Sequence, residues 1–304
     1  MIEKTPLISI IINTHNDVEY IEEAIDSALN QTYQNFEIVL YDNASEKKVF
    51  DVAEKYKDKL IYRRSESFLT LGAARNAAIA ESKGKFITFL DADDIFLPQK
   101  LEMQIPLFSD PEVGLVYSNT FHLIKNDDSW VDEELYEQPM PDGNIFSNLL
   151  KGNFIPFNTA VIKRAVLEND KLKWFNESFD FCTDYDLFLR ISYKYKVKYI
   201  NEPLGKWRIH GSNYTFTKPH LISAERYLMI PRILDYEPEL FDKYKKEMNC
   251  FVAEIFLDMS RYFIHIGQRH RAIACVLNAL MNDLSSKNFR VLMHYLFSGI
   301  KNKI

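Results

Sequence analysis

The stretch FITFLDADDIFLP, residues 86–98, decides the fold and places the candidate site. An apolar run shaped like a buried strand stops at three carboxylates within four residues, Asp91, Asp93 and Asp94. Ionised carboxylates in a dry interior are costly unless a positive group meets them. Open α/β sheets bind ligands at the carboxyl ends of their strands. The pattern therefore predicts a hard divalent metal that also grips a diphosphate; the alternative is a solvated acidic turn that caps a helix starting near Pro98.

The neighbouring segments alternate strands with helices. The small-residue segment before this strand predicts a helix that ends at Gly84 and leads straight into it. Residues 7–13 predict a β-branched strand, followed by a helix capped by Asn16. The run FEIVLYD predicts another strand, which ends in Asp42. Strands that each end in polar residues, with helices between them, predict a doubly wound α/β sheet with a ligand across the strand ends.

The order of these motifs resembles family 2 of the nucleotide-sugar glycosyltransferases, which have the GT-A fold. The motifs are the triplet Thr14–Asn16, the strand ending in Asp42, GAARN at 72–76, LDADD at 90–94, FCTDYDLFLR ending at Arg190, and GKWRIHGSN at 205–213, which looks like the family's basic closing loop. The resemblance covers about residues 5–215. It implies a GT-A-like doubly wound mixed sheet as a catalytic domain over 1–218, with a C-terminal helical region over 219–304.

Three positions depart from the family pattern. Asn13 replaces the usual proline, Asn43 follows Asp42 where a second acid is frequent, and Thr183 replaces the usual glutamate before Asp184. The first two bear on how the base and ribose are held. The third leaves the aspartate itself in place.

The resemblance implies a metal and diphosphate site. Asp93 would bind Mn²⁺ or Mg²⁺ directly, and Asp91 would hold the ribose or the waters of the metal. His210 would be a metal ligand or a donor to the phosphates. Arg208 and Ser212 belong to the basic loop that would close over the diphosphate.

The resemblance also implies a nucleotide site at the sheet edge. Asp42 would accept a hydrogen bond from the uracil N3, which favours UDP. Thr14 and Asn16 would hold the base or ribose. Arg75 would lie beside the base or support Asp42; the alternative for Arg75 is an ion pair with the acidic cluster.

Glycosyl transfer requires that the acceptor hydroxyl lose its proton, and a positioned carboxylate can take it. Asp184, at the start of a predicted helix, is the candidate base; the alternative is an acid that only complements the helix dipole. Asp186 points elsewhere on the helix and is expected to cap or to pair with a cation. One base and no candidate covalent nucleophile predict a single displacement with inversion.

Composition agrees with a folded globular protein. The 304 residues are 47% hydrophobic and 14% aromatic, enough for one large core and a smaller appendage. A net charge of −6 argues against a nucleic-acid partner. Three scattered cysteines make a disulfide framework unexpected. With neither an apolar leader nor an 18-residue apolar run, the sequence predicts a cytoplasmic location.

The predicted function is inverting, metal-dependent transfer of a hexose or N-acetylhexosamine from a UDP-sugar. The acceptor would be a saccharide or a lipid-linked saccharide in bacterial surface-polysaccharide synthesis, as the resemblance implies. The alternative is a non-catalytic nucleotide-sugar-binding protein of the same fold. Dehydrogenase and P-loop functions are excluded because neither GxGxxG nor GxxxxGK[ST] occurs, and a nucleotidyltransferase would need a Gly-rich loop near the amino terminus, where no glycine precedes Gly72.

Two regions outside the motifs carry further predictions. Residues 125–144 predict an exposed hairpin or loop over the site. Beyond about Leu221 the apolar spacing is helical and predicts an antiparallel hairpin of two helices around Gly267. The hairpin's second apolar stripe would comprise Ile273, Val276, Leu277, Leu280, Met281 and Leu284.

The last predicted helix, residues 287–303, is amphipathic and basic. Phe289, Leu292, Met293, Leu296 and Ile300 line one face. Two interpretations are left open. The helix packs on the preceding hairpin or on a second subunit of a homo-oligomer, or the segment 287–304 makes peripheral contact with an anionic membrane at the inner face of the cell membrane.

Overall fold

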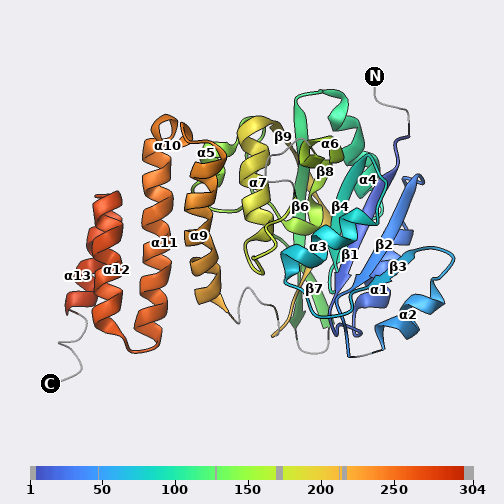
Figure 1. Ribbon diagram of the computed structural model, residues 1–304, viewed down its shortest axis with the longest axis horizontal. Helices are drawn as coiled ribbons and strands as arrows, with labels where there is room; N and C mark the ends of the chain where they lie inside the picture. Colours follow the sequence, from blue (N-terminus) through green and yellow to red (C-terminus); the bar gives the residue numbers. More distant parts are fainter. Residues whose placement is uncertain are drawn as a thin grey trace. The chain divides into compact units, whose positions relative to one another are not determined.

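The computed structural model describes residues 5–46, 48–126, 129–168, 174–211, 213 and 218–297. The chain divides into two compact units (Figure 1). Unit 1 comprises Met1–Phe146 with Phe154–His210, and unit 2 comprises Ser147–Asn153 with Gly211–Ile304.

Unit 1 is built on a mixed sheet whose strands run in the order β3-β2-β1-β4-β8-β6-β9-β5, with β7 paired to β6. The strands are β1 (Ile8–Thr14), β2 (Phe36–Asp42), β3 (Ile61–Arg64), β4 (Phe86–Asp91), β5 (Ile95–Phe96), β6 (Val113–Asn126), β7 (Ser129–Glu134), β8 (Val161–Lys163) and β9 (Lys196–Ile209). The first four are mutually parallel, and β8 lies antiparallel between β4 and β6. Strand β3 has no clear signal in the sequence, because IYRR is short and half polar.

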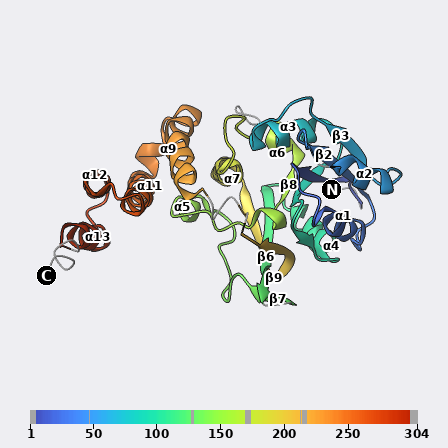
Figure 2. The same cartoon turned by 90° about the horizontal axis from the view of Figure 1, so that it is seen from below.

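Helices cover both faces of this sheet, and Figure 2 shows α1 and α3 on opposite faces. In β1 the side chains of Ile10 and Ile12 join a core with Ile25 of α1, whereas Ile11 is buried outside that core. A strand that is apolar on both sides is typical of a parallel sheet between two helical layers. The helical elements of unit 1 are α1 (Ile21–Leu29), α2 (Val49–Lys55), α3 (Leu71–Ala80), α4 (Lys100–Gln104), η1 (Ile105–Ser109), η2 (Phe157–Thr159), α6 (Arg164–Glu168) and α7 (Thr183–Lys194), while α5 (Phe146–Leu149) straddles the unit boundary.

The predicted cap at Asn16 is wrong. Helix α1 begins at Ile21, and Asn16 has a φ of 60°, a left-handed conformation that asparagine tolerates. Its side-chain Oδ1 accepts from the Glu46 N–H at 2.8 Å, and its own N–H donates to Ser45 Oγ at 2.9 Å. Asn16 therefore fastens the loop after β1 to the loop after β2 instead of starting the helix.

The predicted helix end at Gly84 is also wrong. Helix α3 ends at Ala80, with Glu81 as its C-cap, and its start is capped by Thr70, whose side chain accepts from the Ala73 N–H. Gly84 serves a different purpose: a Cβ there would lie 2.4 Å from the Ser9 backbone nitrogen. Glycine is required because the chain passes tightly against β1 before it enters β4.

Two segments near the acidic cluster take strand form. The predicted hairpin at 125–144 is confirmed in its first part, since β6 and β7 pair antiparallel. The predicted basic loop from Gly205 is wrong as far as Ile209, because these residues continue β9. Trp207 pairs with His122 of β6, and Lys206 pairs with Ile95 of β5. Neighbours on both sides hold this basic segment in the sheet.

Unit 2 is helical where it is described, and its helices are α9 (Pro219–Tyr236), α10 (Leu240–Lys243), α11 (Lys245–His265), α12 (Arg269–Asn282) and α13 (Ser286–Phe297). The predicted hairpin is confirmed as α11 and α12, joined at Gly267, whose φ is 74°. Its core includes Leu257 and Val276, covered by Leu292 of α13. Within the described residues, none of the helices combines the length and apolarity needed to cross a bilayer.

Part of the predicted apolar stripe of α12 is wrong. Leu277, Met281 and Leu284 are 48%, 83% and 85% exposed. The core side of α12 is formed by Ala272, Val276, Ala279 and Leu280, so Val276 and Leu280 of the predicted stripe are confirmed. The side chains of Leu296 and Ile300, which belong to the predicted face of the last helix, lie outside the described part of the chain.

Candidate active site

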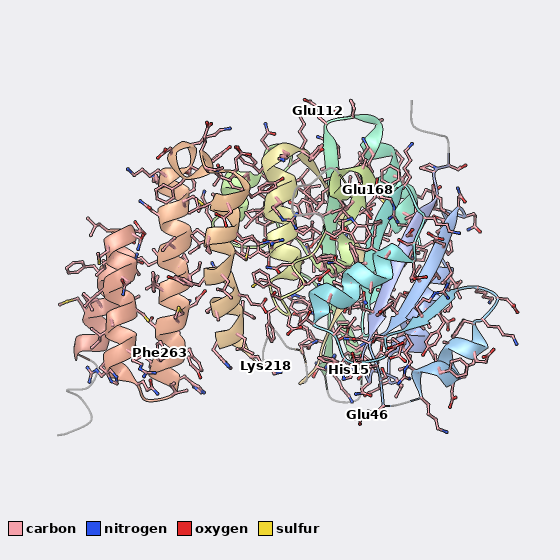
Figure 3. The ribbon with its side chains drawn as sticks, viewed as in Figure 1. His15, Glu46, Glu112, Glu168, Lys218 and Phe263 are labelled. Atoms are coloured by element: carbon pink, nitrogen blue, oxygen red, sulfur yellow. The ribbon has the colours of Figure 1, made fainter. Side chains whose placement is uncertain are left out.

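The candidate site lies at the carboxyl edge of the parallel strands. The register pairs Thr14 with Asp42, and Asn13 with Asp91, so the ends of β1, β2 and β4 align. In Figure 3, His15 and Glu46, which follow β1 and β2, lie at the same edge of unit 1, whereas Glu112, just before β6, lies at the opposite edge. The sheet therefore gathers the predicted nucleotide and metal residues, as their positions after the strands indicated.

The three carboxylates of the 91–94 turn face three different donors. Asp91 Oδ1 accepts from Arg75 Nη2 at 3.2 Å. Asp93 Oδ2 lies 2.8 Å from His210 Nε2, and Asp94 Oδ1 accepts from the backbone N–H of Arg208 at 3.0 Å. The groups that meet this acidic cluster thus come from α3 and from residues 208–210, far away in sequence.

The surroundings of Asp93 suit a bound cation. Burial is the main cause that raises the pKa of Asp93, and the negative charge of Asp91 raises it further, while the hydrogen bond from His210 opposes both. An environment that favours a proton on this carboxylate also favours a metal ion in its place. The side chains of Asp93 and His210 are each 20% exposed, so both remain accessible.

Asp93 and His210 supply one oxygen and one imidazole nitrogen, a donor pair that suits Mn²⁺. Among the described residues, no group of three or more His, Cys, Asp or Glu side chains could hold a metal by itself. A divalent ion bound through one carboxylate completes its coordination with substrate phosphates and water. The residues present therefore fit a metal that binds together with a diphosphate.

Asp94 is an internal anchor. It is 3% exposed, and burial raises its pKa well above the usual value, with Asp93 and Asp91 contributing in the same direction. Its backbone N–H donates to Asp91 O at 3.0 Å, which closes the turn. Asp94 thus fixes the turn to β9 and leaves the other two carboxylates at the edge.

Arg208 is buried beneath the 91–94 turn and contacts several of the residues around it. Its side chain is 2% exposed, and its guanidinium donates to Glu23 Oε2 at 2.5 Å and to Asp93 O at 2.9 Å. It also lies over the rings of Tyr20 and Trp130, at 4.3 and 4.7 Å from their centroids. Tyr20, Trp130 and Glu23 could not be predicted as partners of Arg208, since nothing in the motif pattern marks them. Ser212, expected to close over the diphosphate with Arg208, lies outside the described residues.

Asp42 is fully buried at the end of β2. Its carboxylate accepts from Tyr62 Oη at 2.8 Å, from Arg64 Nη1 at 3.3 Å and from the Ser45 N–H at 2.9 Å. Burial and the hydrogen bond to Asp42 raise the pKa of Tyr62 to about 12. Asp42 therefore orders the loop after β2 in this state, and its contact with uracil stays a prediction.

Thr14 and Asn16 lie in the loop that follows β1. Thr14 is 4% exposed, and its Oγ1 donates to Asp17 O at 3.3 Å. Between them, His15 Nδ1 lies 2.7 Å from Asn43 O, and the His15 ring packs edge-on against Phe68. The loops after β1 and β2 are thus joined into one rim beside the acidic turn.

Asp184 lies in the first turn of α7, and its side chain is partly exposed. Burial raises the pKa of Asp184, and the positive charge of Arg75 acts in the opposite direction. Asp186 is fully buried and pairs with Arg190 at 3.0 Å, which confirms that this second aspartate pairs with a cation. The two aspartates of the motif therefore have different surroundings.

Comparisons with known proteins identify the family of the chain. The family described as Glycosyl transferase family 2 matches residues 9–169. An uncharacterized glycosyltransferase of Rickettsia prowazekii is 32% identical over 224 residues, which cover 70% of this chain and 67% of the relative. The UDP-Glc:alpha-D-GlcNAc-diphosphoundecaprenol beta-1,3-glucosyltransferase WfaP of Escherichia coli is 31% identical over 214 residues, 70% of this chain and 81% of WfaP.

Solved structures share the fold. The S. aureus TarS 1-349 complex with UDP-GlcNAc superposes with a TM-score of 0.66 at 16% identity, covering 96% of this chain and 92% of TarS 1-349. The mannosyltransferase PcManGT from Pyrobaculum calidifontis, solved with GDP-Man and Mn2+, has a TM-score of 0.55 at 18% identity over 98% of this chain and 87% of its own. At these identities the likeness concerns the fold alone.

Fold and family together define a glycosyltransferase of the GT-A type with additional C-terminal helices. The chain belongs to glycosyl transferase family 2 and is an enzyme of that class.

Proposed function

We propose that the protein is an inverting, metal-dependent enzyme that transfers a hexose or N-acetylhexosamine from a UDP-sugar. The observation that carries the proposal is the convergence of Asp93 and His210, 2.8 Å apart, beside Asp91 at the carboxyl edge of the sheet. A negatively charged diphosphate cannot approach these carboxylates unless a cation lies between them. Asp93 and His210 would hold that Mn²⁺ or Mg²⁺ ion.

The metal would supply Lewis-acid stabilisation of the leaving diphosphate. The chain's own residues do the positioning. Asp91 would hold the ribose or a water of the metal, and Arg208 and Asp94 keep the 91–94 turn in place from within the protein. The rim formed by Thr14 and Asn16 would enclose the nucleoside.

Asp42 favours UDP as the nucleotide, as the family resemblance implied. Its carboxylate accepts three hydrogen bonds inside the protein and would accept a fourth from the uracil N3. The solved relative TarS was crystallised with UDP-GlcNAc, and WfaP is named for UDP-Glc, which supports a UDP-sugar.

Asp184 would take the proton of the acceptor hydroxyl as that oxygen attacks the anomeric carbon. A single displacement by the acceptor inverts the anomeric configuration, so an α-linked donor would give a β-linked product. The raised pKa of Asp184 makes it a stronger base than an exposed aspartate. A non-catalytic nucleotide-sugar binder would not need a partly exposed carboxylate here.

The acceptor would be a saccharide or a lipid-linked saccharide of surface polysaccharide. WfaP, which is named for a diphosphoundecaprenol-linked acceptor, supports this class. An acceptor on a lipid carrier requires that the enzyme reach a membrane surface at the cytoplasmic side.

We also propose that the end of unit 2 makes that contact. Residues 267–304 contain six Lys and Arg residues and one Asp, a net charge of +5 in a chain whose total is −6. The same segment exposes large apolar side chains, Met281 and Leu284 from α12 and its end, and Phe289 and Met293 from α13. Apolar side chains among basic ones suit an anionic lipid surface.

The test of the transferase function is a donor screen by thermal melting with Mn²⁺, followed by UDP release with the chosen donor. A donor at 100 times its Kd should add about 2.7 kcal/mol of stability. UDP release that needs Mn²⁺ and disappears in Asp184→Asn, while the donor still stabilises the variant, supports the enzyme. If the donor binds but UDP release stays at the background rate in both wild type and variant, the protein is a non-catalytic nucleotide-sugar binder.

A further inference from the structure

Arg75 contacts both halves of the candidate site. It lies in α3 and is 5% exposed. One guanidinium nitrogen, Nη2, pairs with Asp91 Oδ1 at 3.2 Å at the end of β4, and the other, Nη1, donates to Thr183 Oγ1 at the start of α7. The first contact belongs to the donor edge, and the second lies one residue before the candidate base.

Aromatic rings fix the plane of this guanidinium. The Arg75 Cζ lies 3.9 Å from the centroid of the Phe157 ring and 5.5 Å from that of Phe175. Both rings belong to a cluster with Phe89 of β4. A guanidinium held against aromatic faces keeps its two terminal nitrogens in one orientation. The contacts that these nitrogens make with Asp91 and Thr183 therefore depend on each other.

The same helix also anchors the segment that leads into α7. The Asn76 side chain bonds the Phe175 backbone twice, from Phe175 N to Oδ1 at 2.9 Å and from Nδ2 to Phe175 O at 3.0 Å. The Gly72 N–H donates to Phe179 O at 3.0 Å, and a Cβ on Gly72 would lie 2.0 Å from Asn176 O. This glycine is needed because the two segments touch. The chain before Asp184 is therefore held along the amino-terminal turns of α3.

We propose that Arg75 is a positioning residue that sets the base helix α7 relative to the donor edge, through its paired contacts with Thr183 and Asp91. The ion pair with Asp91 confirms the alternative expected for Arg75, and its place beside the nucleotide base stays a prediction. The inference rests on the proposed function, because it takes Asp184 as the base and Asp91 as a donor-site residue.

The geometry explains why such a residue acts on turnover. Thr183 is 1% exposed and is the first residue of α7, so its position fixes that of Asp184. A general base must lie within hydrogen-bond reach of the acceptor hydroxyl, and a displacement of about 1 Å can cost about 10²-fold in rate. Loss of the Arg75–Thr183 contact therefore lowers turnover without removing a donor contact.

Thr183→Val tests the proposal, because valine keeps the β-branched shape but cannot accept from Arg75. Thr183→Ser, which keeps the hydroxyl, is the matched control. The readouts are kcat and KM for Mn²⁺-dependent UDP release from UDP-glucose or UDP-N-acetylglucosamine, and the Kd of UDP by calorimetry. We expect kcat of the valine variant to fall about 10- to 100-fold, while the Kd of UDP stays within about twofold and the serine variant matches wild type.

Arg75→Lys gives a second measurement if the valine variant is unstable. Lysine keeps the charge but, lacking the fork, cannot make both contacts at once. We expect kcat to fall in this variant too. Unchanged kcat in both variants overturns the proposal, and so does a loss of UDP affinity with kcat intact, which would make Arg75 a nucleotide ligand.

Asp184→Asn, measured in parallel, distinguishes a failure of the proposed base from a failure of the positioning role of Arg75. If it keeps wild-type turnover, the assignment of the base fails. If it is inactive while Thr183→Val and Arg75→Lys match wild type, only the positioning role fails.

Discussion

His210 Nε2 lies 2.8 Å from Asp93 Oδ2, although 117 positions separate the two residues in the chain. The contact joins the end of β9 to the turn after β4. It also makes Asp93 distinct from its neighbour Asp94, whose carboxylate accepts from a backbone N–H inside the protein. Asp93 thus faces His210 at the edge of the sheet, whereas Asp94 anchors the turn inside the protein, and substitutions can distinguish the two roles.

Asp93→Ala should abolish Mn²⁺-dependent UDP binding and leave the fold intact. The reason is that the diphosphate would then meet the remaining carboxylates without a bound cation. The measurement is calorimetry with and without Mn²⁺. Asp94→Asn is the matched control, since asparagine can still accept from the Arg208 N–H; its metal-dependent affinity should stay within about twofold of wild type. Metal-dependent affinity retained by Asp93→Ala would make the cluster structural only.

The pH dependence of turnover should reflect Asp184. Burial raises its pKa above the usual aspartate value, and only the ionised carboxylate can accept a proton. Activity is therefore present above this raised pKa and is lost as pH falls through it, at higher pH than for an exposed aspartate. The pH profile of kcat at saturating donor measures this loss of activity at acid pH. An identical acid limb in the residual activity of Asp184→Asn would assign it to another group.

Much of the donor edge could be predicted from sequence, because a strand followed by aspartates is a local pattern. Asp42 and Asp91 end their strands as expected. The contacts that organise the site could not be predicted. Arg75 meets Thr183 across 108 positions, and Arg208 meets Glu23 across 185. Such pairs depend on the register and curvature of the sheet, which no local pattern specifies.

The local errors have a common physical cause. Asn16 and Gly84 have the residue types of helix caps, but tertiary contacts use them otherwise: Asn16 joins two loops, and Gly84 lets the chain pass close to Ser9. The family resemblance predicts a basic loop at the end of β9, and a loop would expose Arg208. Burial of Arg208 between Tyr20 and Trp130 removes that exposure.

Lys100 should give the protein a pH-dependent stability. It is fully buried in α4, where its Nζ donates to Thr88 Oγ1 and to Gln104 Oε1, each at 2.9 Å, and burial lowers its pKa well below the usual value. The unfolded chain binds a proton on this lysine up to a pKa of about 10.4, so the free energy of unfolding should rise as pH increases toward that value.

Lys100→Met removes this titration. Denaturant melts of wild type and variant between about pH 7 and 10 should therefore show the stability difference moving in favour of wild type as pH rises. A difference that stays constant with pH would mean that Lys100 is charged in the folded protein.

Contact with an anionic membrane should depend on the exposed apolar side chains of α13. Phe289 and Met293 are 56% and 43% exposed. Changing both to serine should reduce co-sedimentation with phosphatidylglycerol-containing vesicles, and added salt should weaken the binding of wild type. Leu221→Ser with Leu228→Ser on α9 is the control, since these exposed residues lie outside the basic segment 267–304.

Point substitutions are sharper here than removal of residues 287–304, because deletion also removes Leu292 from the core of unit 2. Analytical ultracentrifugation of the same variants separates the two interpretations of the helix. Vesicle binding that is equal in wild type and variant, with a changed oligomeric state, would mean that this face packs on a second subunit.

Asp184→Asn and Asp186→Asn should have opposite consequences, although both remove one negative charge from the first turn of α7. Asp184 is partly exposed and is the candidate base, so its substitution should lower transfer about 10²- to 10⁴-fold with UDP affinity and stability near wild type. Asp186 is fully buried against Arg190, at 3.0 Å, so its substitution should cost stability, about 3 kcal/mol by the usual loss on breaking a buried pair.

The two variants therefore need two measurements each: transfer or UDP release at saturating donor, and the free energy of unfolding in denaturant. Asp186→Asn should keep most of its activity at a temperature where it remains folded. Equal losses of activity in both variants, with donor binding and folding intact, would mean that charge in this turn matters and that Asp184 has no specific role as a base. Strong destabilisation by Asp184→Asn would place this residue in the structure of α7 instead of in the chemistry.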